Sequence, residues 1–299
     1  MTSYATETLQ NYQQKNADRA RFLINCPDRP GIVAAVSQFL QGHGANIVES
    51  DQYTMDPMGG EFFIRIEFEC PNLKEIADKL EADFQPIAEE FQMDWKIMYV
   101  SDIKNMAIFV SKEPHALLEL LWEWQSGDLM ANISLVISNH EDAREMVESL
   151  GIPFYYIPAN KDIRKQVEEK QKELLAAHEI DVIVLARYMQ ILTPDFVQSF
   201  ENRIINIHHS FLPAFVGAKP YERAYQRGVK MIGATSHYVT NDLDEGPIIE
   251  QDIGRVDHHD DVEDMKKIGQ KIERSVLARA VKWHLDDRII VHGNKTIVF

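Results

Sequence analysis

Cysteine is scarce in this chain of 299 residues, which contains only Cys26 and Cys70. The two lie far apart and outside any CxxC pattern, so the sequence predicts neither a disulfide scaffold nor a structural zinc site, and a reducing compartment is expected. Long apolar runs are also missing, since no stretch approaches the length that crosses a bilayer. Residues 1–20 are polar and of mixed charge, unlike a signal peptide. We therefore expect a soluble, cytoplasmic protein that does not enter a membrane.

Positive charge is in deficit, because 31 basic residues face 47 acidic ones and give a formal net charge of −16. Such a field repels a phosphate backbone, so nucleic acid is not expected as a partner.

The sequence also lacks motifs that bind a metal ion or a dinucleotide cofactor. There is no HExxH spacing, and Gly42-His43-Gly44 follows a helical segment and lacks the third glycine of a dinucleotide loop. The sequence therefore predicts neither a metal nor a cofactor.

Hydrophobic residues make up 45% of the chain, which is enough for packed cores, and the length favours two domains. In the first block, alternating and helical apolar spacings follow in the order β-α-β-β-α-β, which is typical of a ferredoxin-like fold. The predicted strands are 21–25, 46–55, 61–69 and 94–100, and the predicted helices are 32–40 and 73–91.

From residue 106 onward, strands and helices alternate, which predicts a Rossmann-like, mostly parallel, doubly wound sheet with helices on both faces. The predicted strands are 106–110, 132–138, 153–157 and 182–185, and the helices are 117–124, 143–150 and 162–178. Residues 288–299 are expected to form a hairpin around Gly293-Asn294. The boundary near 101–104 gives an N-terminal domain, 1–102 with a core of about 21–100, and a C-terminal domain, 103–299.

Residues that could act on an acyl group gather in two short stretches. In Asn206-Ile207-His208, which follows an apolar run, the amide and the imidazole are two residues apart. On an extended backbone they face the same side, about 6.6 Å apart. Asp244-Glu245-Gly246-Pro247 adds a carboxylate on a stiff turn. Each of these residues alone would more often be a satisfied polar group, but together they can polarise a carbonyl and move a proton.

The first block resembles the ACT domain, a small regulatory module that commonly binds amino acids between paired copies. The resemblance rests on Asp28-Arg29-Pro30-Gly31-Ile32-Val33 and on Asn46-Ile47. It implies an effector site and a homo-oligomer, a dimer or a tetramer, that pairs through these domains. The effector-binding residues that it implies are Asp28, Arg29, Pro30, Gly31, Ile32 and Asn46.

The second block resembles the folate-dependent formyltransferase fold. Asn206-Ile207-His208, Thr235-Ser236-His237-Tyr238-Val239 and Leu243-Asp244-Glu245-Gly246-Pro247 match its catalytic signature in order and spacing. An ACT domain in front of this fold resembles the arrangement of the formyltetrahydrofolate deformylase family. The resemblance implies hydrolysis of 10-formyltetrahydrofolate to formate and tetrahydrofolate, which would supply formate to purine synthesis and balance one-carbon pools.

The same resemblance assigns roles to individual residues. Asn206, His208 and Asp244 would be catalytic, and His237 would orient Asp244. Arg187 to Leu192 would line the pterin pocket, mostly through backbone groups. The implied substrate-binding residues are Arg187, Tyr188, Met189, Gln190, Ile191, Leu192, Glu245 and Gly246.

Departures from the transferase pattern favour a hydrolase. Transferases that act on a phosphorylated ribosyl amine carry a glycine-rich phosphate loop after the first strand, whereas residues 110–115 contain no glycine here. His209 and Glu245 stand where transferases usually have proline and glycine. Two alternatives remain open: a formyltransferase that uses an amine acceptor, and a non-catalytic regulator that binds folate or an amino acid.

Overall fold

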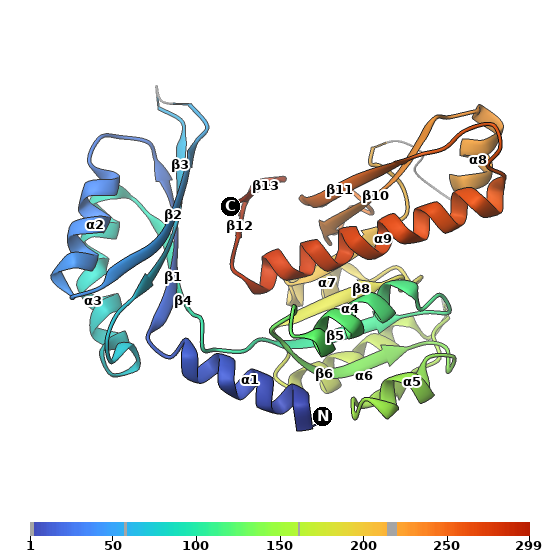
Figure 1. Ribbon diagram of the computed structural model, residues 1–299, viewed down its shortest axis with the longest axis horizontal. Coiled ribbons are helices and arrows are strands. Elements are labelled where there is room, and N and C mark those ends of the chain that lie inside the picture. Colours follow the sequence, from blue (N-terminus) through green and yellow to red (C-terminus); the bar gives the residue numbers. More distant parts are fainter. Residues whose placement is uncertain (1–2, 57–58, 161, 214–219) are drawn as a thin grey trace. The chain divides into compact units, whose positions relative to one another are not determined.

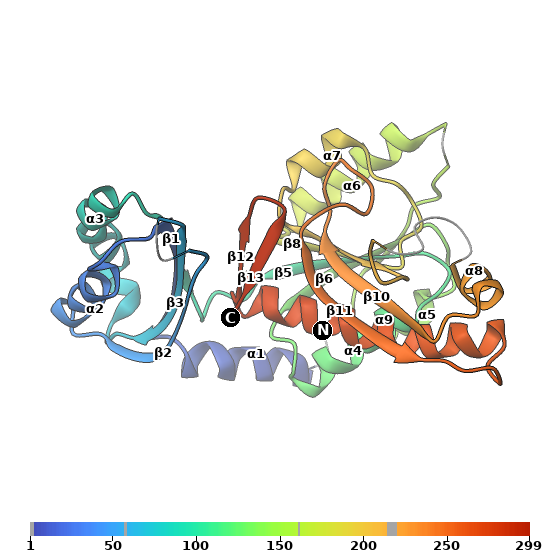
Figure 2. The same cartoon turned by 90° about the horizontal axis from the view of Figure 1, so that it is seen from above.

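The computed structural model describes residues 3–56, 59–160, 162–213 and 220–299, which fold into two compact units (Figures 1 and 2). The N-terminal unit contains residues 7–103, 287–290 and 297–299, and the C-terminal unit contains residues 3–6, 104–286 and 291–296. The predicted division into 1–102 and 103–299 differs mainly at the C-terminus, where two short stretches group with the N-terminal unit.

The N-terminal unit has the predicted ferredoxin-like order. Its four-stranded antiparallel sheet has the strand order β2-β3-β1-β4, and α2 and α3 cover one face (Figure 1). The elements are β1 (Arg19–Pro27), α2 (Ile32–Gly42), β2 (Asn46–Thr54), β3 (Glu61–Glu69), α3 (Leu73–Phe91) and β4 (Asp94–Tyr99). An additional helix that the sequence analysis did not predict, α1 (Ser3–Lys15), precedes them.

The two faces of this sheet differ because successive side chains on a strand point to opposite sides. Phe22 of β1 faces the helices, and its ring meets that of Phe84 with centroids 4.4 Å apart. Arg21, its neighbour, points to the other face and donates from Nη1 to Asp287 Oδ2 at 3.1 Å. Arg65 of β3 donates from Nε to the Asp287 carbonyl at 3.1 Å. These bonds explain why the stretch that begins at Asp287 groups with the N-terminal unit.

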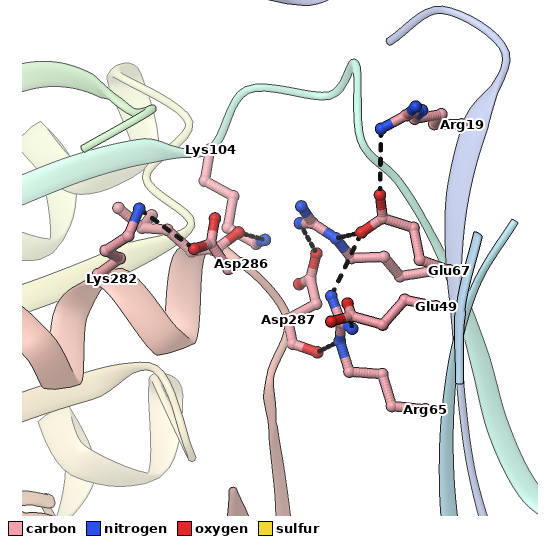
Figure 3. Close-up of polar contacts among 10 residues, drawn as sticks. Arg19, Glu49, Arg65, Glu67, Lys104, Lys282, Asp286 and Asp287 are labelled. Carbon is pink, nitrogen blue, oxygen red and sulfur yellow. Dashed lines mark hydrogen bonds and ion pairs between the residues drawn. The ribbon is translucent and has the colours of Figure 1, made fainter. Parts of the chain in front are cut away.

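Carboxylates complete this buried charge network (Figure 3). Glu67 accepts from Arg21 Nε at 3.1 Å, and Glu49 accepts from Arg65 Nη1 at 2.6 Å. Burying a guanidinium is unfavourable unless it is paired and hydrogen-bonded, and both arginines meet this condition.

The C-terminal unit contains a seven-stranded sheet with the order β11-β10-β9-β8-β5-β6-β7. Strands β5 to β9 pair in parallel, and β10 and β11 add an antiparallel edge, so the prediction of a mostly parallel sheet is confirmed. Helices α4 and α9 lie on one face, and α6 and α7 lie on the other (Figure 2).

The strands of this unit are β5 (Asn105–Val110), β6 (Asn132–Ser138), β7 (Phe154–Tyr156), β8 (Val182–Ala186), β9 (Ile204–His208), β10 (Met231–Tyr238) and β11 (Ile248–Arg255). The helices are α4 (His115–Ser126), α5 (Arg144–Ser149), α6 (Arg164–Ala177), α7 (Pro194–Ser199), α8 (Pro220–Arg227) and α9 (Val262–Leu285). The predicted hairpin is present as β12 (Ile289–His292) and β13 (Lys295–Val298).

The apolar sequence of β8 explains its central position, because a strand buried on both faces needs a continuous apolar run. Parallel pairing of β8 with β9 brings the loop after Ala186 and the end of β9 at His208 to the same edge of the sheet. The long helix α9 begins with a capping box formed by Asp261 and Asp264. Within the described part of the chain, no helix is long and apolar enough to cross a membrane.

Candidate active site

A cavity of about 300 Å³ opens at the carboxyl ends of β8 and β9. Asn206, His208, His237 and Asp244 all line it, so the structure brings together the amide, the imidazoles and the carboxylate of the two sequence motifs. This edge of an open parallel sheet is where ligands bind in such folds.

His208 and Asp244 form a direct pair. Nδ1 of His208 lies 3.2 Å from Oδ2 of Asp244. Burial would raise the pKa of the Asp244 carboxyl, but the hydrogen bonds and charges of His208 and His237 together outweigh it and hold the pKa well below its ordinary value. Nε2 of His208 is buried and has no hydrogen-bond partner among the described residues. One ring nitrogen of His208 therefore contacts Asp244, and the other is available to hydrogen-bond a group bound in the cavity.

His237 contacts both Asn206 and Asp244. Its Nδ1 lies 2.9 Å from the Tyr238 carbonyl, which can only accept, so Nδ1 carries a hydrogen. Nε2 lies 3.2 Å from Asn206 Nδ2 and 3.7 Å from Asp244 Oδ1. Nε2 therefore faces both the amide of Asn206 and the carboxylate of Asp244. The sequence analysis assigned His237 to Asp244 alone, whereas the structure also shows the shorter contact with Asn206.

The turn that carries Asp244 is held rigidly against β10. Asp244 has φ +60°, a left-handed conformation that is unfavourable for residues other than glycine and is often retained at functional sites. The amide of Tyr238 donates to the Pro247 carbonyl at 2.9 Å. A Cβ atom at Gly246 would lie 1.8 Å from the Tyr238 carbonyl oxygen, so only glycine permits this approach. Gly246 therefore allows two backbone segments to approach closely. Neither Gly246 nor the exposed Glu245 lines the cavity.

Residues 187–192 line the cavity as a continuous segment. The side chain of Tyr188 is turned into the core, where its ring lies 5.2 Å from Phe109 and its hydroxyl accepts from Gln171 Nε2 at 2.9 Å. Tyr188 can therefore contact a ligand mainly through its backbone. Met189 and Ile191 are 60% and 54% exposed and give the cavity apolar side chains suited to a flat ring.

A buried polar network at the cavity was not anticipated from the sequence. Nη1 of Arg187 lies 2.6 Å from His209 Nδ1, and its Nη2 lies 3.2 Å from Glu113 Oε2. Arg187 Nε lies 3.4 Å from Oε2 of Glu273 in α9. These residues are far apart in sequence, and no motif or spacing links them. The 239–243 loop also lines the cavity, and its position between two catalytic motifs was the available signal for it.

The implied effector residues do not meet in one place within the N-terminal unit. Asp28 accepts from Thr54 Oγ1 at 2.7 Å, and the Arg29 guanidinium lies 4.2 Å from the centre of the Phe91 ring. Gly31, with φ +101°, precedes α2, whose first residue Ile32 is buried. Asn46 pairs through Glu69 with the start of β1, whereas Asp28 follows its end. The length of β1 therefore separates Asn46 from the others.

Across residues 3–56, 59–160, 162–213 and 220–299, no three His, Cys, Asp or Glu side chains are placed to hold a metal ion. Cys26 and Cys70 are free, buried thiols.

Known proteins share both the domain order and the overall fold. Residues 104–281 match the family model described as formyl transferase, and residues 20–85 match that of the ACT domain. A formyltetrahydrofolate deformylase of Bacillus subtilis (strain 168) is 67% identical over 299 residues, which cover 100% of both chains. The chain belongs to the formyltetrahydrofolate deformylase family.

Solved structures show the same relationship. The crystal structure of a formyltetrahydrofolate deformylase from Pseudomonas syringae pv. tomato has a TM-score of 0.89 and 46% identity, covering 97% of this chain and 99% of that one. A glycinamide ribonucleotide transformylase from Symbiobacterium toebii has a TM-score of 0.62 and 28% identity, covering 66% of this chain and 94% of that one. The deformylase family therefore shares its larger domain with transformylases and adds an ACT domain.

Proposed function

We propose that the chain hydrolyses 10-formyltetrahydrofolate to formate and tetrahydrofolate, with Asn206, His208 and Asp244 as catalytic residues. The decisive observation is the geometry of this group. An ionised carboxylate contacts Nδ1 of His208 at 3.2 Å, while Nε2 of the same ring is left for a bound group. Membership of the deformylase family supports the same reaction.

Each residue has a definite task in the proposed reaction. Water attacks the formyl carbon, and the carbonyl oxygen becomes negatively charged. The Asn206 amide and the protonated His208, through Nε2–H, stabilise that oxygen, a contribution that is usually the largest single one in acyl transfer. Asp244 takes a proton from the attacking water, and a relay through solvent protonates the departing N10. The pterin ring lies along the 187–192 segment.

Water rather than an amine is the proposed acceptor because of the loop between β5 and α4. A glycine-rich loop before a helix N-terminus would hold a phosphate through its backbone amides. Here Glu113 is part of that loop, and its carboxylate pairs with Arg187. The carboxylate repels a phosphate group and neutralises the guanidinium that could attract one.

The first test is turnover of 10-formyltetrahydrofolate by the purified chain, with chelator present and no amine acceptor. We expect stoichiometric release of formate and tetrahydrofolate, since the proposed reaction needs no metal or cofactor. Release that occurs only after an amine is added would instead identify a transferase. Folate binding without release under either condition would identify a regulator and contradict the proposal.

We further propose that the N-terminal units pair and bind an amino-acid effector between two copies. Strand β2 is an edge strand with the exposed apolar residues Ile47, Val48 and Tyr53. An edge of this kind favours pairing with another chain. Because Asn46 lies far from Asp28 in one unit, an effector that contacts both needs a second copy. Sedimentation of the full chain and of Val48→Lys, with and without added amino acids, tests this pairing.

Both cysteines are buried thiols, which fits the proposed location in a reducing cytoplasm. Cell fractionation with an antibody against the chain tests that location.

A further inference from the structure

His209 follows the catalytic imidazole directly and has no task in the proposed reaction. Its ring lies nearly parallel to that of His208, with the planes 24° apart and the centroids 5.1 Å apart, and it lines the same cavity. Two imidazoles this close compete for a proton, because a charge on one disfavours a charge on the other. The reaction needs the proton on His208, so the state of His209 matters.

The contact with Arg187 determines that state. A guanidinium has only donors and remains charged, so the 2.6 Å contact with Arg187 Nη1 requires Nδ1 of His209 to accept. The hydrogen of the neutral ring is then on Nε2. A second proton would have to bind at Nδ1, against the guanidinium. Burial first, and Arg187 second, lower the pKa of His209 to about 4.

Other ionisable groups also face His209 from the surrounding elements. His208 is the preceding residue, at the end of β9, whereas Asp244 directly follows the 239–243 loop and Glu273 belongs to α9. Tyr221 of α8 has its ring centroid 6.3 Å from that of His209. Asp244 and Glu273 favour a charged His209, but burial and the charge of Arg187, which is in direct contact, outweigh them.

Glu273 forms an ion pair with Arg187 and also contacts two other residues. It is 1% exposed, and its Oε2 lies 2.8 Å from His115 Nε2 in addition to the contact with Arg187 Nε. Its Oε1 accepts from the Tyr221 hydroxyl at 2.8 Å. Burial would raise the pKa of Glu273, but the hydrogen bond from His115 and the charge of Arg187 lower it, so the carboxylate is ionised. Arg187 itself is held in a left-handed conformation, with φ +64°.

The packing of α9 makes room for this arrangement. Gly269 is one turn before Glu273 on the same face of the helix. A Cβ atom at Gly269 would lie 2.0 Å from the Tyr221 hydroxyl oxygen. The glycine thus lets Tyr221 reach Glu273.

We propose that Glu273 is a positioning residue: it holds Arg187 against His209, fixes His209 as a neutral imidazole with its hydrogen on Nε2, and leaves His208 to carry the proton. The catalytic consequence rests on the proposed hydrolysis, whereas the tautomer of His209 does not. The two can therefore be tested separately.

The tautomer is tested by long-range proton–nitrogen NMR on the full chain with ¹⁵N-labelled histidine, and His209→Gln assigns the signals. We expect His209 to show a bare Nδ1 and a protonated Nε2, unchanged from about pH 8 to about pH 5. In Arg187→Met the ring should titrate within this range. Arg203→Met removes an exposed guanidinium before β9 and should leave the His209 signals unchanged. A protonated Nδ1 in the neutral ring, or titration above about pH 5 in the unsubstituted chain, overturns the proposal whether or not the chain releases formate.

The positioning role is tested by the pH dependence of kcat/KM in Glu273→Gln, which keeps the shape of the side chain and removes its charge. We expect a new ionisation on the acid side, with kcat near pH 6 reduced at least about tenfold and KM changed less than about twofold. Glu263→Gln, at an exposed site on the same helix, should match the unsubstituted chain. A folded Glu273→Gln with an unchanged pH profile refutes the positioning role.

Discussion

Two buried arginine–carboxylate networks, one in each unit, use the same chemistry for different ends. In the N-terminal unit, Arg21 and Arg65 of the sheet hold Asp287 (Figure 3). In the C-terminal unit, Glu273 holds Arg187. Each network contains a residue other than glycine in a left-handed conformation, with φ 50° at Asp287 and φ 64° at Arg187. Both networks therefore constrain the backbone as well as the side chains.

The difference lies in what the arginines contact. Arg65 bonds carboxylates and a backbone carbonyl, groups that remain acceptors throughout the physiological pH range. Arg187 also contacts His209, an imidazole that lines the catalytic cavity. The first network thus holds a backbone segment at Asp287, whereas the second sets the hydrogen position on a ring that lines the catalytic cavity. Substitutions in the two units should separate activity from stability.

The largest effect on turnover is expected for Asp244→Asn. A neutral amide cannot take the proton from water, so kcat should fall at least about 100-fold. Asparagine tolerates the left-handed conformation at this position, so the fold should persist. Steady-state assays and circular dichroism provide the measurement, with Asp142→Asn, at an exposed site in the same unit, as the control. Near-normal turnover would remove Asp244 from the mechanism.

A smaller loss is expected for Gly246→Ala. The added Cβ would overlap the Tyr238 carbonyl oxygen, so the turn must move and carry Asp244 with it. A displacement of about 1 Å can reduce kcat by about tenfold to 100-fold. Gly42→Ala is the matched control, because a Cβ there meets nothing within 4 Å. If kcat is retained, the position of Asp244 does not depend on this close approach.

The neutral state of His209 predicts a pH-dependent stability. The pKa of His209 in the folded chain, about 4, is below the ordinary value of 6.5. On acidification His209 therefore binds a proton in the unfolded chain before it does so in the folded chain. Stability present above about pH 6.5 is therefore lost as the pH falls toward about 4, by up to about 3 kcal/mol. Urea unfolding at pH 7 and at about pH 4.5 measures the loss, which should be smaller in His209→Gln. An equal loss in both proteins would show that His209 titrates normally in the fold.

The smallest effect on turnover is expected for Asp287→Asn in the N-terminal unit. The substitution removes the charge that faces Arg21 but keeps a side chain that tolerates φ 50°. The free energy of unfolding should fall by about 1–3 kcal/mol, while kcat changes less than about twofold. Denaturant unfolding together with the turnover assay checks both, and Asp94→Asn, at an exposed site in the same unit, is the control. A large fall in kcat would show that this network also serves the reaction.

Much of the fold could be predicted because its signals are local. The alternating segment 21–25 lies within β1, the segment 61–69 coincides with β3, and the run 182–185 lies within β8. The 24-residue helix α9 was not predicted, and neither was α1, whose sequence is polar. Residues 287–290 and 297–299 group with the N-terminal unit because Arg21 and Arg65 bind Asp287. In the sequence these arginines look like ordinary charged residues on strands.

The candidate site, like the fold, could be predicted from the sequence only in part. Asn206, His208 and Asp244 belong to short motifs, so sequence reasoning could place them together, and the structure has them in one cavity. Their catalytic roles stay predictions until the substitutions are measured. Substrate binding by Gly246 also stays a prediction, and its close approach to Tyr238 is a backbone role that only the tertiary structure reveals.

The sequence alone determined the β-α-β-β-α-β order of the first domain, the family and the common side of Asn206 and His208, because apolar periodicity and strand alternation act between near neighbours. Tertiary structure decided which arginine meets His209, which carboxylate supports that arginine and where Asp287 binds. These contacts join residues that are 22 to 266 positions apart, and they form only where packing brings the segments together. Burial then strengthens the electrostatic interactions enough to hold a backbone conformation at Asp287 or the position of a hydrogen on His209.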